Sequence, residues 1–475
     1  MSRPQSAPAR QAAARRVRPA EAIAAEPLER ASLRGFLRQL AARGELRHIQ
    51  AEVDPRFELG AYLWQLARGP AVLFERVRGS DVPVVGNLLN SRERFGLALG
   101  VPWRDVYGRT LQALEQPIAP ELVSQAPCQE VDHAVDLRRL PVPTWFEHES
   151  GAYITAGVIV AKDPHSGRRN VSIARVQVRG ARSAFIGIAP NHHLSVFARR
   201  AAALGRKLEV AVTIGQHPAV VLASNLYVRP GDDEFDNAGA LLGRPVSLVR
   251  CRSIDVEVPA DSELVLEGTL DPATLLQEGP VSEFHGLYQR YSGGPEVTFS
   301  AITSRRTPIL QVITPSLQPE HLLIGAVGIA ATAGQAVLSA LPESNAHVVI
   351  TEASGGRLHA VVQLRNPAPG DPRKAMFAIW GHVNLVKLVT VVNDDVDPYD
   401  PAAVEYALAT RFRAERDVVI VPRVRGDRAD PLVTDGLVTK MALDATRKAE
   451  DREDWRAARP PQAVLDLVAD HLRSL

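Results

Sequence analysis

The chain has 475 residues, enough for about three domains or one large two-part enzyme. Its 55 lysines and arginines nearly balance 54 aspartates and glutamates, and the net charge of +1 argues against a nucleic acid as the main partner. Two cysteines, Cys128 and Cys251, exclude a disulfide framework and favour a reducing, cytoplasmic location. We find no run of about 18 apolar residues and therefore expect no membrane-spanning helix and no membrane partner.

The first part of the chain divides into a tail and a small domain. Residues 1–28 are rich in Arg and Ala, and we interpret them as a disordered tail, although an Arg-rich, acid-poor start is also typical of a transit peptide. Residues 29–125 alternate helix-like and strand-like patterns, which predicts an N-terminal α/β domain. The expected helices are 33–41 and 58–68, and the expected strands are 46–49, 71–74 and 82–86.

The middle of the chain, residues 126–312, contains many short runs rich in Val, Ile and Leu, bounded by Gly, Pro, Asp and Ser. So many strands with one helix, at 193–203, predict a barrel or a sandwich. The expected strands are 156–162, 171–178, 208–214, 220–224, 246–249, 264–270, 297–304 and 309–312.

Residues 313–475 alternate again and predict a C-terminal α/β domain that ends in an amphipathic helix at 460–473. The strand-like run at 385–393 is almost wholly apolar, which is typical of a strand buried on both faces. The other expected elements are helices at 326–340, 373–382 and 401–412 and strands at 347–351, 358–364 and 418–421.

Two carboxylates in the middle region are candidates for proton transfer. Glu278 and Glu283 are five residues apart, and the Gly-Pro pair between them predicts a loop or a strand–loop junction. Two nearby carboxylates raise one pKa, so one can donate a proton near neutral pH, while an arginine between them holds the other ionised. Two solvated surface acids are the simpler interpretation of this pair alone. Residues 285–291 follow it and either face a pocket or form a connecting strand.

Three scattered residues could hold a metal ion. Asn170, His192 and Glu234 offer an amide oxygen, an imidazole and a carboxylate, a mixture that suits Mn²⁺ or Mg²⁺ better than a thiophilic metal. A cation held in this way keeps open positions for a phosphate. A histidine taken alone is more often a hydrogen-bonded structural residue.

These residues lie in four segments that occur in a fixed order. The segments are Asn170–Arg175 (Asn-Val-Ser-Ile-Ala-Arg), Pro190-Asn-His192, the acidic Asp233–Gly239, and Glu278–Gly286 (Glu-Gly-Pro-Val-Ser-Glu-Phe-His-Gly). Together they resemble the UbiD family of reversible decarboxylases, which use prenylated FMN. Similar family segments follow at 387–397, 409–411 and 440–446, so the resemblance covers roughly residues 30 to 450.

The resemblance implies an α/β protein whose central split β-barrel binds prenylated FMN. It also implies reversible, non-oxidative removal of CO₂ from an aromatic, heteroaromatic or α,β-unsaturated carboxylic acid. In the family's pattern, Arg175, Glu278 and Glu283 are the catalytic network, with Glu283 as the proton donor. The metal ligands are Asn170, His192 and Glu234, and a K⁺ site would use Ala223, Ser224 and Glu234. The implied cofactor contacts are Ser172, Ile173, Ala174, Arg175, Asn191, His192, Ser224, Glu234 and Lys387.

The resemblance carries three further expectations. A flavin prenyltransferase would supply the cofactor, and the chain would form a homodimer or a larger homo-oligomer to which the helix at 460–473 could contribute. Val171 and Asn191 differ from the aromatic residue and the glutamine that several members have there, which puts the pocket shape in doubt. The alternative is an oxidoreductase that binds ordinary FMN in a split barrel, but hydride transfer does not need two glutamates beside Arg175.

Overall fold

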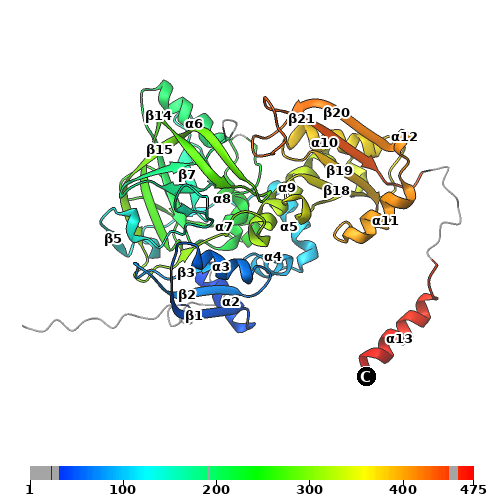
Figure 1. The fold of residues 1–475 in the computed structure, drawn as a ribbon, viewed down its shortest axis with the longest axis horizontal. Helices are drawn as coiled ribbons and strands as arrows, with labels where there is room; N and C mark the ends of the chain where they lie inside the picture. Colours follow the sequence, from blue (N-terminus) through cyan, green and yellow to red (C-terminus); the bar gives the residue numbers. More distant parts are fainter. Residues whose placement is uncertain (1–22, 24–30, 190–191, 230, 449–457, 475) are drawn as a thin grey trace, which may run out of the picture.

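The computed structural model describes residues 23, 31–189, 192–229, 231–448 and 458–474. The cofactor contact expected at Asn191 therefore lies outside the described residues, as does the predicted tail apart from Ile23, which is buried in the core. Figure 1 shows three parts: a blue N-terminal unit below, a green strand-rich body above it, and a yellow-to-orange C-terminal unit beside both.

The N-terminal unit is a four-stranded sheet in the order β1-β2-β3-β16, with α2 packed against β1. The strand predicted at 309–312 exists as β16, but it pairs in parallel with β3 and so belongs to this sheet, not to the barrel. Two helices that precede the middle region, α4 and α5, were not predicted. The bounds are α2 Leu33–Ala42, β1 Leu46–Val53, α3 Glu58–Gln65, β2 Ala71–Val77, β3 Val84–Gly86, α4 Arg92–Leu99, α5 Val106–Glu115 and β16 Leu310–Gln311.

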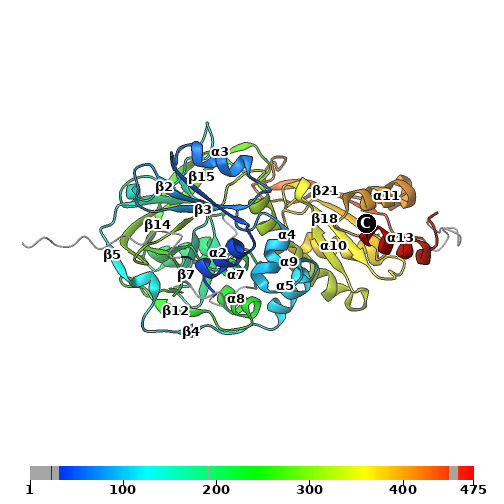
Figure 2. The same cartoon turned by 90° about the horizontal axis from the view of Figure 1, so that it is seen from below.

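The middle region is a nine-stranded sheet that curls into a half-barrel, as Figures 1 and 2 show. Its path is β6-β9-β10-β15-β14-β11-β7-β8, and β5 pairs with β15. A small sheet, β13-β12-β4, and three helices lie with it. The bounds are β4 Glu121–Leu122, β5 Val131–His133, β6 Tyr153–Ile154, β7 Val158–Lys162, β8 Arg169–Ile173, β9 Val176–Val178, β10 Ser183–Ile186, α6 His193–Ala203, β11 Leu208–Ile214, α7 Pro218–Ala223, α8 Glu234–Leu242, β12 Ser247–Arg250, β13 Glu257–Pro259, β14 Leu264–Ser282 and β15 Tyr288–Ser304.

Two predictions for this region are wrong. The run at 171–178 is not one strand, because it breaks at Ala174 and Arg175 into β8, which pairs with β7, and β9, which pairs with β10 and β6. Residues 220–224 are not a strand either: they lie in α7 and its C-terminal cap, and the His217 side chain caps this helix by accepting from the backbone N–H of Ala219. A short apolar run buried on every side has no period that separates helix from strand.

The C-terminal unit is a five-stranded sheet in the order β17-β18-β19-β21-β20. The apolar strand β19 lies between β18 and β21 and pairs in parallel with both, as its two-sided burial predicts. Strand β21 was not predicted as a strand. The bounds are α9 Pro319–Ala340, β17 His347–Ile350, β18 His359–Leu364, α10 Asp371–His382, β19 Leu388–Asn393, α11 Pro401–Arg411, α12 Ala414–Asp417, β20 Val418–Arg425 and β21 Leu437–Asp444.

Helix α9 corrects an expectation about long apolar runs. It begins at Pro319, seven residues before the predicted start at 326, and has 22 residues with a mean hydropathy of 1.8 in its most apolar window. By length and composition alone it could cross a membrane, so the expectation that no such run exists is wrong. However, 83% of that window is buried inside the protein. The helix packs against α5, α7, α10 and β17, and it therefore joins the three parts of the molecule.

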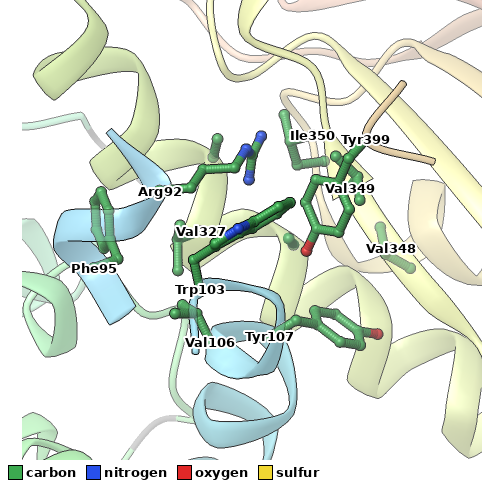
Figure 3. Close-up of a pocket in the computed structure, with 12 residues that line it drawn as sticks. Arg92, Phe95, Trp103, Val106, Tyr107, Val327, Val348, Val349, Ile350 and Tyr399 are labelled. Carbon is green, nitrogen blue, oxygen red and sulfur yellow. The ribbon is translucent and has the colours of Figure 1, made fainter. Parts of the chain in front are cut away.

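An aromatic cluster joins the C-terminal unit to the segment between α4 and α5. Trp103 and Tyr399 meet edge to face with ring centres 5.0 Å apart, and the Arg92 guanidinium lies 4.7 Å from the Tyr399 ring centre (Figure 3). Arg104 forms an ion pair with Asp397 at 2.8 Å. Aromatic pairs and cation–π contacts favour particular geometries, so this cluster helps to fix how the C-terminal unit sits beside the N-terminal unit.

The predicted C-terminal helix is confirmed as α13, Gln462–Ser474, and it stands apart from the rest of the chain in Figure 1. Its apolar side chains have no core to enter, since Leu467 is 69% exposed and Leu472 is 64% exposed. An exposed apolar stripe of this kind on a helix marks a contact surface.

Candidate functional site

Two adjoining cavities lie between the half-barrel and the C-terminal unit. The first has a volume of about 240 Å³ and the second about 230 Å³. The two cavities share part of their wall, which Ile173, His192, Asn225 and Arg357 form. The first also has Trp145, Glu149, Tyr153, Ala174, Arg175, Glu283 and His321 in its wall, and the second has Asn170, Ser172, Ser224, Tyr227, Gly325 and Glu234.

Strand β8 and helix α8 place the predicted metal ligands in the second cavity. Asp233 caps α8, which puts Glu234 in its first turn, buried to 3% exposure. The carboxylate accepts hydrogen bonds from Asn170 Nδ2 and from the backbone N–H of Val171, each at 2.7 Å. Burial raises the pKa of Glu234 to about 8, and among the described side chains it has no ion-pair partner. A buried carboxylate without a cation fits a site for one.

His192 completes this set from the turn that leads into α6. It lines the same cavity as Asn170 and Glu234, and withdrawal from water lowers its pKa, so the imidazole is neutral. The neutral form is the one that binds metals. The structure therefore places the three predicted ligands in the wall of one cavity, with Asn170 and Glu234 in direct contact, and their donor types fit Mn²⁺ or Mg²⁺.

The residues proposed for K⁺ also lie close to this cavity. Ser224 and Glu234 line it, and Ala223 is buried at the end of α7. The Ser224 hydroxyl donates to the Val221 carbonyl at 2.8 Å, and the Ser224 carbonyl accepts from the Ile173 backbone N–H at 3.3 Å. The oxygen atoms of Ser224 are thus already oriented by the protein backbone.

The predicted catalytic residues form one network beside the first cavity. Arg175 Nε and Nη2 donate to the two oxygens of Glu278, the second at 2.9 Å, and Arg175 Nη1 donates to Glu283 Oε1 at 2.9 Å. Glu278 lies inside β14 and Glu283 directly after it, so they flank the Gly-Pro pair at the end of a strand. The structure thus confirms the predicted geometry, in which an arginine lies between two carboxylates.

Burial by itself would raise the pKa of Glu283, but the Arg175 guanidinium and the Tyr291 hydroxyl outweigh it and lower this pKa. The resting carboxyl is therefore ionised. Arg175 has its pKa raised well above the usual value by the two carboxylates despite its burial, so it stays charged. Gly187 is packed against this network, because a Cβ there would come within 3.2 Å of both Arg175 and Glu278.

Several residues of the first cavity carry no recognisable motif. The Glu149 carboxylate accepts from the Ser282 hydroxyl at 2.7 Å, and burial raises its pKa. His321 lies at the start of α9 with Nδ1 3.0 Å from the Ser316 carbonyl, and burial lowers its pKa to about 4. Arg357 donates to the backbone carbonyls of His321 and Leu322. The sequence around Glu149, His321 and Arg357 does not indicate a role in the site, because these residues come from separate segments that meet only in the folded protein.

Lys387 lies elsewhere. Its ammonium forms an ion pair with Asp430 Oδ1 at 2.9 Å, and it is not among the described residues that line the two cavities. Its expected contact with the cofactor phosphate stays a prediction, which requires the Lys387 ammonium to leave Asp430 and bind the phosphate.

Comparison with known proteins agrees with this geometry. Three profiles match: the 3-octaprenyl-4-hydroxybenzoate carboxy-lyase N-terminal domain at 37–114, the Rift-related domain at 121–318 and the C-terminal domain at 322–445. An anhydromevalonate phosphate decarboxylase of Methanosarcina mazei is 35% identical over 435 residues, which is 90% of this chain and 99% of the relative.

Solved structures give the same result. The UbiD-class enzyme HmfF from Pelotomaculum thermopropionicum, in complex with FMN, is 39% identical with a TM-score of 0.87, covering 93% of this chain and 100% of that one. An evolved dimeric form of HmfF in complex with prFMN is 38% identical with a TM-score of 0.85 over the same shares of the two chains. Since the three profile matches span residues 37 to 445 with only short gaps, the chain belongs to the UbiD family.

Proposed function

We propose that the protein is a decarboxylase that uses prenylated FMN to remove CO₂ from an aromatic, heteroaromatic or α,β-unsaturated carboxylic acid, in a reversible reaction without net oxidation. The observation that carries the proposal is the Glu278–Arg175–Glu283 network, which borders a cavity that adjoins the one lined by Asn170, His192 and Glu234. The named activity of the Methanosarcina relative supports it.

The second cavity would hold the cofactor phosphate. A divalent cation on Asn170, His192 and Glu234 would neutralise phosphate charge there, and K⁺ beside Ser224 would add to this effect. The flavin would extend past Ile173, which lines both cavities, toward Arg175. Bound prenylated FMN supplies the electron sink that loss of CO₂ from an unsaturated carbon requires. The walls of the half-barrel would orient the substrate and exclude water.

Glu283 would supply the proton that replaces CO₂. It is ionised in the resting site, so it must gain a proton before it can act as an acid. Binding of the substrate would cause this protonation, because the negative charge of the substrate carboxylate raises the pKa of the neighbouring Glu283 carboxyl. Glu278 would hold Arg175 in place through its two hydrogen bonds and would not itself donate a proton.

The alternative, an oxidoreductase with ordinary FMN, is not favoured. Hydride transfer has no use for an arginine shared by two buried glutamates, and the Methanosarcina relative is a named decarboxylase. The cofactor would come from a flavin prenyltransferase, which makes that enzyme a required partner in any functional test.

The direct test is release of CO₂ from a panel of aromatic, heteroaromatic and α,β-unsaturated acids. Protein co-expressed with a flavin prenyltransferase should release CO₂ from at least one class of acid. The matched control is protein made without the prenyltransferase, which should bind unmodified FMN and stay inactive. Equal activity in the two preparations would rule out the prenylated cofactor and favour the alternative.

We also propose that two copies of the chain pair through α13. The exposed apolar side chains Leu467 and Leu472 would then be covered by the same surface of the second copy. A chain that ends at residue 458, or one with both leucines changed to Ser, should lose the dimer at micromolar concentration. Light scattering measures this directly, and a variant that keeps the wild-type mass would show that the contact lies elsewhere.

A further inference from the structure

Glu283 receives two hydrogen bonds on the same oxygen. Tyr291 lies on β15 and is only 8% exposed, and its hydroxyl donates to Glu283 Oε1 at 2.9 Å. Arg175 Nη1 donates to that same Oε1, also at 2.9 Å. Among the described residues, none forms a hydrogen bond with Glu283 Oε2. One oxygen of this carboxyl is therefore held by the protein, while the other is left to the cavity that Glu283 lines.

This asymmetry decides where a proton can sit on Glu283. An oxygen that already accepts an N–H and an O–H has no lone pair directed at solvent or substrate, and a proton placed there would meet the hydrogens of both donors. Protonation therefore takes place on Oε2. Since the two donors fix Oε1, the rotation of the carboxyl is fixed as well, and Oε2 keeps one direction.

A residue of the C-terminal unit contacts the same tyrosine. The Arg428 guanidinium, from the segment between β20 and β21, lies 4.4 Å from the centre of the Tyr291 ring, and Arg175 lies 5.2 Å from it. Cations over a phenol ring are attracted to its face and make its hydroxyl a better donor. The position of Tyr291 thus depends on whether the C-terminal unit is seated against the half-barrel.

We propose that Tyr291 is a positioning residue for proton transfer: with Arg175 it occupies Oε1 of Glu283, so that the transferred proton is carried on Oε2, and Arg428 ties this arrangement to the seated C-terminal unit. The inference rests on the proposed function. In the step itself, the electron pair of the bond to the departing CO₂ becomes the pair of the new C–H bond, the proton comes from Oε2, and Glu283 is left as a carboxylate. This is its resting form, and it takes up a proton from solvent when the next substrate binds.

Other charged and titratable groups also surround Glu283, and they set the background against which Tyr291 acts. Burial keeps His321 neutral, with its pKa at about 4, and burial likewise lowers the pKa of His285. Removal of the Tyr291 hydroxyl takes one donor from the ionised form of Glu283, so the pKa of this carboxyl should rise. The groups that face Glu283 are Arg175, Tyr291, His285, His321 and Arg357.

The test is Tyr291→Phe, which keeps the ring and its stacking but removes the hydroxyl. Below the pKa of Glu283, where the carboxyl is protonated in both proteins, kcat/KM should fall by at least about 10-fold. A hydrogen bond to a charged group is typically worth a factor of about 10 to 100, and Glu283 becomes charged as its proton leaves. The pH at which Glu283 titrates should rise by about one unit. Infrared difference spectra of the cofactor-free protein measure that titration without activity, with Glu283→Gln identifying the band. Tyr288→Phe is the matched control, because Tyr288 is 40% exposed and its hydroxyl contacts the His148 backbone instead.

Arg428→Gln tests the link to the C-terminal unit. It should lower kcat/KM in the wild-type background and have little further effect when added to Tyr291→Phe, because both changes act through one hydroxyl. Fully additive effects would overturn this part. An unshifted Glu283 titration in Tyr291→Phe, or a kcat/KM within about threefold of wild type, would overturn the whole inference. A wild-type protein that releases no CO₂ would instead remove the proposed function, while the infrared titration would still decide the role of Tyr291.

Discussion

Replacing Glu283 by glutamine should lower kcat by at least about 10²-fold while leaving flavin and metal bound, since general acid catalysis is typically worth about 10²–10⁴-fold. Glutamine keeps the size of the side chain and can still accept from Arg175 and Tyr291, but it has no proton to give. Glu283 lies in the first cavity and the metal set in the second, so the cofactor anchor should survive. Turnover and flavin absorbance measured on the same sample separate the two effects.

The pH dependence of this reaction has a definite sign. Only the protonated form of Glu283 can act as the acid, so kcat should fall as the pH rises through the pKa of this carboxyl in the substrate complex. In D₂O the wild type should place deuterium on the carbon that lost CO₂. Glu296→Gln on β15 is the matched control, since Glu296 lies in neither cavity, and it should turn over normally. Glu283→Gln activity within about threefold of wild type would show that another group is the acid.

The site residues that the sequence predicted are those that lie in short segments with a recognisable order of residue types. Arg175, Glu278 and Glu283 lie in short segments whose order and spacing are specific, and the structure joins them by hydrogen bonds. Asn170 and Glu234 were predicted in the same way, although 64 residues separate them, because each sits in its own recognisable segment. The motif identifies which side chain takes part in the site, and the strand or helix that contains the motif orients that side chain.

The residues that were missed act through tertiary contacts. The sequence left open whether residues 285–291 face a pocket or form a strand, and both hold for Tyr291, which lies on β15 and reaches Glu283 because β14 and β15 form a long hairpin. No pattern in these residues distinguishes Tyr291 from Tyr288. Arg357 and His321 enter the cavity from the two ends of a C-terminal segment that contains α9. Only the packing of that helix between the units brings them beside Arg175.

The errors in secondary structure have the same cause. Burial on every side removes the polar positions from which a period is recognised, so α7 was mistaken for a strand. The start of α9 was placed too late although Pro319 and Glu320 are typical of a first helical turn, because the buried Glu320 breaks the apolar pattern there. The break between β8 and β9 was hidden for a different reason. The alternation slips by only one residue, where Ile173 and Ala174 are both apolar, and it then resumes through Arg175. The change of partner strand at that point depends on the closure of the half-barrel.

Changing Glu234 to Ala should remove the cofactor. Loss of one ligand of three should weaken the metal and phosphate anchor by at least about 10-fold, because even a residue that only orients a ligand contributes on that scale. Flavin absorbance and the metal content by mass spectrometry measure the loss. Asp236→Asn, on the same helix two residues further along, is the matched control and should keep both. Full flavin occupancy in Glu234→Ala would show that the anchor lies elsewhere.

The pKa of Glu234 gives this prediction a pH dependence. Burial raises the pKa to about 8, so the carboxyl of the metal-free protein holds a proton at neutral pH. A divalent cation must displace that proton, and its affinity should therefore fall as the pH is lowered below about 8. Metal binding at pH 7 should release a proton, which titration in two buffers of different ionisation enthalpy can count. Glu234→Gln keeps the hydrogen-bonding size of the side chain but has no proton to release, so residual binding by this variant should lose the pH dependence.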